Sequence, residues 1–453
     1  MSVSRELAEW VATLEWLQLP SATRDLAVLR LLDTTGLLLG ASGAPAAAMI
    51  RARATASAGG GRSSMVGHSR TVPAGAAALA HGVIAHCLDY DDTLPDSVVH
   101  PGSVVVPTAL AVGEETGASG RDILTAIAAG YEICARLARV GGTGFHAHGF
   151  HASGIFAPIS AAYTAGRLLR LSPDAMSAAA GLAASMSGGL LAFIEDGSWS
   201  KWLHLGWGAH GGILAAQLAA DGFRGPQGAL DGRHNLFAAF LSGAPSDPST
   251  AVKDLGTNWA GDAARFKYYP CAHVIQPYID LALDLRRAHA IDAAHVTAVH
   301  CTVAPWAVPI VCEPAAAKLQ PRSVVDAIAS LRFNVAAALV DGRVGLDILD
   351  EPTWQRHDII ELARRTGYTI DPALVGFAGK IEIELANGSR HAAQADGAAP
   401  PDAERLRTKF RALAARALAE TKIAALEQAI ASFSGATHPA LIGAAFRAAA
   451  GHA

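Results

Sequence analysis

Cysteine is scarce in this chain and is never paired at short spacing. The 453 residues include five cysteines, and no two of them form a CxxC motif. Disulfide-stabilised secreted folds and iron–sulfur clusters both need several closely placed thiols, so the sequence argues against both classes. We interpret the five as reduced, buried thiols of a cytoplasmic protein: Cys87, Cys134, Cys271, Cys301 and Cys312.

An excess of positive charge is also missing. The chain has 36 lysines and arginines against 40 acids, which gives a net charge of -4 and a pI near 6.5. Proteins that bind polyanions usually carry a basic field over at least one face. We therefore expect no nucleic-acid partner.

Long runs of strongly apolar residues are absent as well. Two uncharged runs, 175–194 and 202–220, consist of Ala, Gly, Ser and His more than of Leu or Ile, which makes them poor membrane spans. The first residues, MSVSRELAEWVATL, have early acids and no uninterrupted apolar core, unlike a signal peptide. We expect no membrane partner.

Alternating β-branched runs are rare over about the first 260 residues, where apolar positions recur at spacings of three and four. Helix starts are marked at Ser119 and by Ser172-Pro173-Asp174. Gly59-Gly60-Gly61 and Gly141-Gly142 interrupt the pattern, but neither follows a strand, as a phosphate-binding loop would. The pattern predicts a large all-helical domain.

The character of the sequence changes after Pro270. The segments 295–308 and 380–385 have the β-branched alternation of strands, and Asn387-Gly388 has the chemistry of a tight turn. A proline turn within 397–406 then starts two amphipathic helices that run to about residue 434. We predict a mostly α protein with a smaller α+β domain over residues 268–400.

Acids and a histidine crowd into one polar island at Leu88–His100, LDYDDTLPDSVVH, between alanine-rich segments. Asp89, Asp91 and Asp92 cannot all be buried as anions without paired cations or hydrogen bonds. We therefore expect them at a solvated rim or in a ligand cleft. The alternative is a solvated loop in which Asp92 or Thr93 caps a helix.

Five segments, taken in order, resemble the corresponding parts of the MmgE/PrpD family, and the resemblance spans most of the chain. They are HCLDYDDT at 86–93 with HPG at 100–102, GFHASG at 149–154, DGSWSKWLHLGWGAHGGILAAQLAADGFRGP at 196–226, FKYYPCAH at 266–273, and PRSVVDAIASLRFNVAAALVDG at 321–342. Family members include 2-methylcitrate dehydratase, cis-aconitate decarboxylase and iminodisuccinate epimerase, which act on small di- or tricarboxylates.

The resemblance has implications for the fold and assembly. It implies that the last helices fold back on the first domain, so that residues 1–267 and 401–453 form one discontinuous helical domain, with 268–400 as an α/β lid domain. It also implies a homodimer formed through the helical domain, which the many small residues on its helices favour. No cofactor or metal is expected.

The resemblance also implies roles for particular residues. His100 and His151 lie in Gly/Pro-flanked loops and would carry protons, because histidine titrates near neutrality. Lys201 and Lys267 have aromatic and apolar neighbours and would bind substrate carboxylates, although a lysine stem packed on apolar surface has the same pattern. Asp89 matches the first acid of the family motif and would orient a histidine or contact the substrate.

Further positions concern substrate binding. His204 and His273 are expected in the layer of side chains that surrounds the residues in contact with the substrate. His81-Gly82 stands where the family commonly has Asn-Gly, and Phe333, after Ser330, stands where it commonly has a tyrosine. Loss of the tyrosine hydroxyl removes a donor, which weakens the decarboxylase reading in particular.

Parts of the sequence also fit two other functional classes. His146, His148 and His151 in GFHAHGFH could hold zinc in a hydrolase, with Asp89 or Asp92 as an oxygen ligand, but the preceding sequence is helical and not a strand end. A catalytically inactive scaffold would lack histidine or lysine at the family positions. We therefore predict a cofactor-independent lyase that removes a proton alpha to a carboxylate, most simply the dehydration of a 2-methylcitrate-like hydroxy acid, with decarboxylation or epimerisation as the alternatives.

Overall fold

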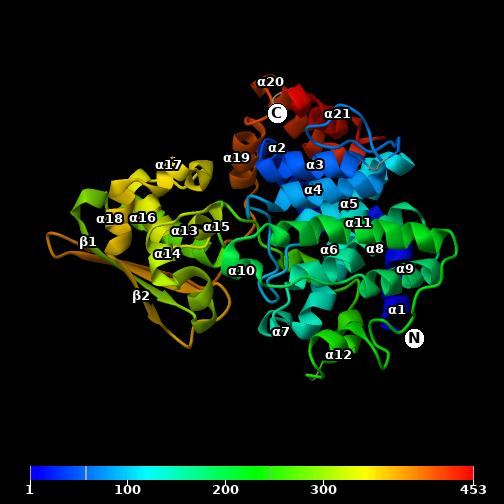
Figure 1. Cartoon of the computed structure of the whole chain (residues 1–453), viewed down its shortest axis with the longest axis horizontal. Coiled ribbons are helices and arrows are strands. Elements are labelled where there is room, and N and C mark those ends of the chain that lie inside the picture. The colour runs from blue at the N-terminus through cyan, green and yellow to red at the C-terminus, as the bar shows by residue number, and fades with distance from the viewer. Residues whose placement is uncertain (1, 57–58, 245, 452–453) are drawn as a thin grey trace. The chain divides into compact units, whose positions relative to one another are not determined.

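The computed structural model describes residues 2–56, 59–244 and 246–451 and divides the chain into two compact units (Figure 1). The larger unit is helical and consists of Met1–Cys87, Asp91–Ala264 and Asp402–Ala453. The smaller unit combines Leu88–Tyr90 with Arg265–Pro401 and contains the sheet. The predicted fold class, a discontinuous helical domain with a smaller α+β domain, is confirmed.

The helices of the larger unit come from both ends of the chain. They are α1 Val3–Thr13, α2 Ser21–Gly40, α3 Pro45–Ala56, α4 Ala74–His86, α5 Gly102–Thr116, α6 Gly120–Gly141, α7 Gly144–Ala147, α8 Ala152–Leu168, α9 Pro173–Ser185, α10 Phe193–Asp196, α11 Ser200–Ala220, α12 Leu236–Phe240, α19 Ala403–Ala414, α20 Glu420–Ala431 and α21 Ala440–Ala448. Ser119 caps α6 and Ser172 caps α9, as predicted.

Small residues allow α11 to pack directly against α4 and α8. A Cβ atom added to Gly82 of α4 would lie 2.6 Å from the Cα of Gly206 in α11, which is closer than real Cβ contacts come. A Cβ added to Gly206 would lie 2.3 Å from the carbonyl oxygen of Leu79. Only glycine therefore fits at this crossing, and its close approach sets how near the ends of these helices lie to one another.

The C-terminal segment completes the helical unit by packing α19 against α2, and Figure 1 shows the orange-to-red helices beside the blue one. The Lys409 ammonium lies 2.7 Å from an Asp33 carboxylate oxygen, and both side chains are 3% exposed. Breaking such a buried pair by removing one partner leaves an uncompensated charge, which is strongly destabilising. The last fifty residues thus belong to the same core as the first forty.

The smaller unit is built on a four-stranded sheet. Its strands are β1 Val296–Val303, β2 Thr366–Ile370, β3 Gly379–Leu385 and β4 Arg390–Ala395, in the order β2-β1-β3-β4. Strands β1 and β2 are parallel, whereas β1 with β3 and β3 with β4 are antiparallel. The helices are α13 Gln276–Ala288, α14 Ala315–Leu319, α15 Val324–Ile328, α16 Leu331–Asp341, α17 Glu351–Trp354 and α18 His357–Arg364.

Two strands were predictable and two were not. The expected strands at 295–308 and 380–385 correspond to β1 and β3, although the structure ends β1 at Val303 and continues with a 3-10 turn at Pro305–Ala307. The predicted turn joins β3 to β4, with Gly388 at φ 84°. Strand β4, RHAAQA, is rich in alanine, and β2 is short, so neither has a strong β-branched signature.

A membrane-spanning helix must be long and apolar enough to cross the bilayer. Among the described residues, no single helix has the length and apolarity to cross a bilayer. Helices α2 and α3 meet at a bend of 97°, and as a pair they reach that length and apolarity by residue count and composition alone.

Helix α11 carries an exposed apolar stripe on the helical unit. Leu203, Trp207 and Leu214 are 40–52% exposed, and they share one face with His210, whose ring stacks on Trp207 at 5.6 Å. Exposed apolar side chains gathered on one helix face are typical of a contact between copies, because water contact with such a patch is unfavourable. The homodimer stays a prediction, and we expect this stripe of α11 to form its interface.

We predict that Trp207→Lys separates a homodimer into monomers. The parent should scatter light with twice the 46.6 kDa mass of one chain at micromolar concentration, and the variant should approach the single-chain mass. Leu441→Lys, at an apolar side chain 63% exposed on α21, is the control and should leave the mass unchanged. A parent that is monomeric across this range contradicts the prediction.

Candidate active site

A buried histidine–carboxylate pair lies at the end of α4. The His86 Nδ1 atom is 2.8 Å and 3.0 Å from the two carboxylate oxygens of Asp91, and Ser103 Oγ donates to the same carboxylate at 2.6 Å. The carboxylate can only accept, so Nδ1 carries a hydrogen, and in the neutral ring Nε2 has the lone pair. Nε2 is buried and has no hydrogen-bond partner among the described residues.

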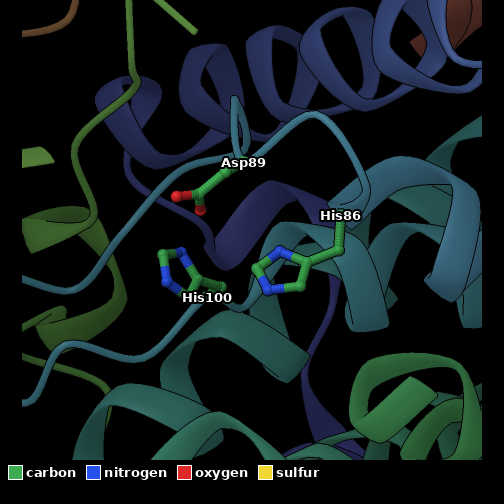
Figure 2. Close-up of side chains that lie close together, drawn as sticks. All are labelled: His86, Asp89 and His100. Atoms are coloured by element: carbon green, nitrogen blue, oxygen red, sulfur yellow. The ribbon is translucent and has the colours of Figure 1, made fainter. Parts of the chain in front are cut away.

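His100 approaches the same carboxylate from the other side. Its Nδ1 lies 2.9 Å from the Asp92 carbonyl oxygen, which requires Nδ1–H and leaves Nε2 as the basic nitrogen of the neutral ring. Its backbone N–H donates to Ser153 Oγ at 3.1 Å, and Asp91 Oδ1 lies 4.0 Å from Nδ1. The rings of His86 and His100 project toward each other, with centroids 4.9 Å apart (Figure 2).

His151 and His204 form a second pair. His151 is the N-cap residue of α8, and its backbone N–H donates to the Gly189 carbonyl at 3.0 Å. Its Nδ1 lies 3.1 Å from Nδ1 of His204 on α11, so one ring must donate and the other accept. The ring of His151 also stacks near His86, with centroids 6.2 Å apart.

Burial keeps this second pair uncharged. It holds the pKa of His151 well below its usual value, and the charges of His86 and Lys201 add to the effect. Burial, followed by the charge of His86, lowers the pKa of His204 to about 4. Both rings are therefore neutral near pH 7 in the unliganded protein, where they can accept a proton once an anion offsets the charge.

Lys201 supplies positive charge next to these rings. It lies in the first turn of α11, and its ammonium lowers the pKa of both His146 and His151. The His146 ring lies 6.5 Å from that of His151, and its pKa falls to about 4, mainly through burial. A cation that acts on two histidines is suitably placed for an anionic ligand in the helical unit.

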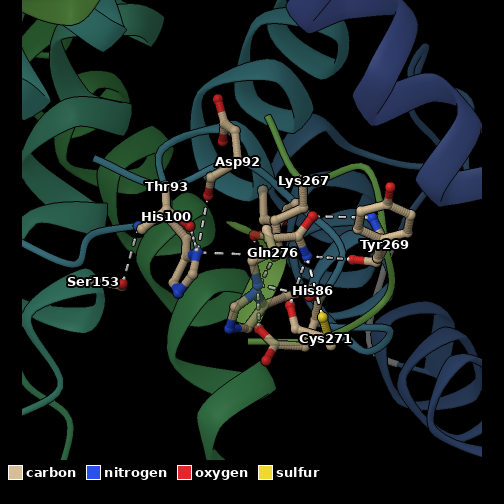
Figure 3. Close-up of polar contacts among 12 residues, drawn as sticks. His86, Asp92, Thr93, His100, Ser153, Lys267, Tyr269, Cys271 and Gln276 are labelled. Carbon is tan, nitrogen blue, oxygen red and sulfur yellow. Dashed lines mark hydrogen bonds and ion pairs between the residues drawn. The ribbon is translucent and has the colours of Figure 1, made fainter. Parts of the chain in front are cut away.

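In the smaller unit, Lys267 already has an anionic partner. Its Nζ donates to Asp89 Oδ1 at 2.9 Å and to the Asp89 carbonyl oxygen at 2.6 Å, and both side chains are buried. Lys267 is among the residues whose polar contacts Figure 3 shows. Asp89 has φ 48°, in the left-handed region that Asp tolerates better than most residues. Gln276 holds the following loop by accepting from the backbone N–H groups of Tyr268 and Tyr269.

Three predicted binding residues have the contacts of core side chains. His81 Nε2 accepts from the Val66 N–H at 2.9 Å, its ring packs against Phe446, and burial lowers its pKa to about 3. His273 stacks on Phe377 with centroids 4.7 Å apart. Phe333 is fully buried in α16, behind the Ser330 cap. The structure shows these three side chains packed in the core. Their roles in substrate binding stay predictions.

Of the two places expected for the three acids, the solvated rim was wrong, and the ligand cleft stays a prediction. Asp89, Asp91 and Asp92 are 5%, 1% and 2% exposed. Each carboxylate is buried because each has its own donors: Lys267 for Asp89, His86 and Ser103 for Asp91, and the Gly102 N–H with the Tyr131 hydroxyl for Asp92.

The histidines proposed for zinc do not converge. Within the described residues, His146, His148 and His151 do not bring three ligand atoms within 4.8 Å of one another. His148 is exposed, and its Nδ1 atom lies 2.9 Å from the Gly144 carbonyl oxygen. The arrangement that a tetrahedral zinc site needs is therefore not formed by these three residues.

Sequence reasoning missed His86 and Asp91 as a pair. Their spacing of five residues spans the end of a helix and a turn, which no simple periodicity places face to face. The available signal was a histidine in the last turn of a helix followed by a run of acids, where a helix C-terminus favours a positive charge.

Comparison with known proteins gives matches over nearly the whole chain. The model of the MmgE/PrpD N-terminal domain matches residues 5–249, and that of the MmgE/PrpD C-terminal domain matches residues 269–433. The cis-aconitate decarboxylase-like protein oryM of Aspergillus oryzae is 25% identical over 95% of this chain and 94% of its own. The cis-aconitate decarboxylase of Aspergillus terreus is 24% identical over 81% and 80%, and that of Homo sapiens 27% over 76% and 73%.

We predict that Asp92→Asn removes part of the pH dependence of stability. Burial raises the pKa of Asp92 to about 7 from an ordinary 3.8, against the opposing hydrogen bond from Tyr131. The folded state therefore holds this proton longer than the unfolded state, and stability should fall as pH rises from about 4 to 7. The full effect is at most about 4 kcal/mol, on the scale of 1.36 kcal/mol per pKa unit.

Denaturant unfolding at several pH values measures this effect. The asparagine variant should show a flatter decline over that range than the parent, because its amide cannot ionise. Asp96→Asn, which removes an acid from an exposed pair with Arg139, is the control. Equal slopes for parent and Asp92→Asn contradict the prediction.

Proposed function

The chain belongs to the MmgE/PrpD family, and on that premise we propose that it is a cofactor-independent lyase acting on a small di- or tricarboxylate. The observation that carries the proposal is the group of buried and half-buried histidines at the ends of α4, α8 and α11, next to a lysine. Neutral imidazoles beside a fixed cation suit proton transfer on an anionic substrate.

The chemistry that we propose begins at the carbon alpha to a carboxylate. A neutral ring nitrogen of His100 or His151 takes the proton from this carbon, and the carboxylate accepts the developing charge. A second protonated group then gives its proton to the hydroxyl on the neighbouring carbon, which leaves as water. The pKa of His151 is low mainly because the ring is buried, and neighbouring positive charge lowers it further. Such a ring becomes an effective base when substrate carboxylates offset that positive charge.

Dehydration of a 2-methylcitrate-like hydroxy acid is the reaction that we propose. Dehydration needs both a base and an acid, and His100 and His151 offer separate groups for these tasks. Decarboxylation of a cis-aconitate-like acid is the second candidate, favoured by the names of the relatives. It needs chiefly an acid that protonates the carbanion, and epimerisation by the same first step is a third reaction to test.

Phe333 does not separate these reactions. Its side chain is fully buried in α16, so the missing tyrosine hydroxyl would point into packed surroundings. The absence of that hydroxyl therefore counts less against decarboxylation than the sequence alone suggests.

A panel of hydroxy and unsaturated di- and tricarboxylates in deuterated water tests the proposal. Proton and carbon NMR then separate the three outcomes: water loss with an unsaturated product, carbon dioxide loss with deuterium at the vacated carbon, or deuterium exchange with inversion. Product formation by decarboxylation alone would overturn the dehydratase assignment and leave the lyase class standing. Absence of all three reactions across the panel would overturn both.

On the substrate so identified, we predict that His100→Ala and His151→Ala each lower turnover by about 10²–10⁴-fold, because each removes a group that carries a proton. Circular dichroism and thermal unfolding should match the parent closely enough to show an intact fold. Chelator treatment should leave the parent rate unchanged. A variant that keeps the parental rate excludes its histidine from the mechanism.

Lys201→Met is predicted to weaken binding. The change keeps the length of the stem and removes a charge-assisted contact of about 1.5–3 kcal/mol, which corresponds to roughly 10- to 150-fold in affinity. Calorimetric binding should lose most of its salt dependence in this variant. Lys253→Met, at an exposed lysine, is the control, and equal affinity of Lys201→Met and parent would contradict the carboxylate contact.

Lys267 needs a different design, because Lys267→Met alone leaves the Asp89 carboxylate buried without its cation. The double variant Asp89→Asn/Lys267→Met removes both charges and separates lost stability from lost substrate affinity.

A further inference from the structure

His86 is a buried polar side chain, and its Nε2 atom makes no hydrogen bond to a described residue that would hold the fold together. The ring is 0% exposed, and Nε2 has no hydrogen-bond partner among the described residues. A buried nitrogen without a partner costs stability and calls for an explanation, of which a place in catalysis is one. The reaction steps described above use His100 and His151 and leave His86 without a role.

Two features allow the His86 ring to hold a second proton. The Asp91 carboxylate at 2.8 Å is a counter-charge in direct contact with the opposite nitrogen, and Ser103 holds that carboxylate in place. His86 is also in the last turn of α4, where the C-terminal end of the helix dipole favours a positive side chain. A proton placed on Nε2 would therefore complete a buried ion pair, and the carboxylate would stay ionised.

The position of the ring relative to its neighbours matters equally. Its centroid lies 4.9 Å from that of His100 and 6.2 Å from that of His151, which stacks at 22°. His151 in turn contacts His204 through their Nδ1 atoms at 3.1 Å. His86 thus lies within reach of both candidate proton carriers, while Asp91 restricts its own tautomer and orientation.

At the end of each dehydration, the base holds a proton that the acid needs for the next turnover. The C–H bond breaks and its proton ends on the base, whereas the C–O bond breaks and the hydroxyl leaves as water with the proton of the acid. The base is then protonated and the acid is not. One proton must return from base to acid before the next substrate reacts, and in a buried site bulk water is a poor carrier.

We propose that His86, held by Asp91, is the positioning residue that returns this proton between the His100 and His151 sides of the site, an inference that rests on the proposed function. His86 Nε2 accepts the proton from the protonated base and forms the ion pair with Asp91. It then passes the proton to the deprotonated acid and regains its neutral Nδ1–H tautomer. No proton is gained or lost over the cycle, and no bond to the substrate involves His86.

The proposal predicts a specific kinetic signature for His86→Gln. The first turnover should keep a rate near that of the parent, because base and acid are intact and correctly protonated. Later turnovers should slow by about 100-fold, the lower end of the range for a lost proton-transfer group. Rapid mixing should therefore show a burst of one product per active site, absent from the parent. Added imidazole should raise the slow rate, since a diffusible carrier can return the proton.

Asp91→Asn is the second variant, because it keeps a hydrogen-bond acceptor for His86 and removes the counter-charge. It should show the same burst with a smaller fall in the later rate. His68→Gln, at a histidine outside the cluster whose Nδ1 contacts the Arg70 carbonyl, is the control and should show the parental time course. Thermal unfolding of each variant checks that the fold is kept.

The outcomes separate this proposal from the function on which it rests. A burst with imidazole rescue in His86→Gln and Asp91→Asn supports the return of the proton through His86. Equal loss of the first and later turnovers, without rescue, overturns it and gives His86 a structural role. Parental kinetics in both variants also overturn it. A parent that decarboxylates and never dehydrates overturns the proposed dehydration instead, and would be recognised in the product spectrum before any variant is made.

Discussion

The buried site depends on how two adjacent carboxylates are accommodated at the start of one helix. Asp91 and Asp92 are neighbours in the chain, yet they face different partners: Asp91 accepts from His86 and Ser103, and Asp92 accepts from the Gly102 N–H and Tyr131. Gly102 and Ser103 are the first residues of α5, whose N-terminal end favours negative charge. A Cβ at Gly102 would lie 2.6 Å from Asp92, so glycine is required there. This arrangement lets the loop enter the interior and brings the histidines with it.

Small residues supply the second condition for the site. Because α11 crosses α4 at a glycine–glycine contact and also packs on α8, the ends of the three helices lie close enough for their histidines to interact. His86 ends α4, His151 starts α8, and His204 lies in the second turn of α11. The small residues that permit this close packing thus also concentrate titratable groups in one region. Burial then produces the low pKa values that keep these rings neutral.

The sequence predicts the helical unit and the two strands with strong alternation, because these follow from local periodicity and capping. The return of the C-terminal helices to the helical unit was expected only from the family resemblance. The sequence does not predict that the acids are buried. Burial of Asp89 requires Lys267, 178 residues away, and burial of Asp92 requires Tyr131. Long-range pairs of this kind have no local signature. The same reason hides the His86–Asp91 pair and explains why His81, a promising candidate by position, has the contacts of a core residue against Phe446.

The buried Lys409–Asp33 pair has a consequence for how this chain is made on the ribosome. Synthesis proceeds from the N-terminus, so Asp33 and the apolar face of α2 emerge some 370 residues before the helix that covers them, and the whole smaller unit is made in between. Domains generally fold in order of emergence. Here the helical unit cannot complete its core until residues 403–414 have emerged, whereas all segments of the smaller unit are available by residue 401. Until then the nascent helical unit exposes the apolar face of α2, which is the kind of surface that chaperones bind.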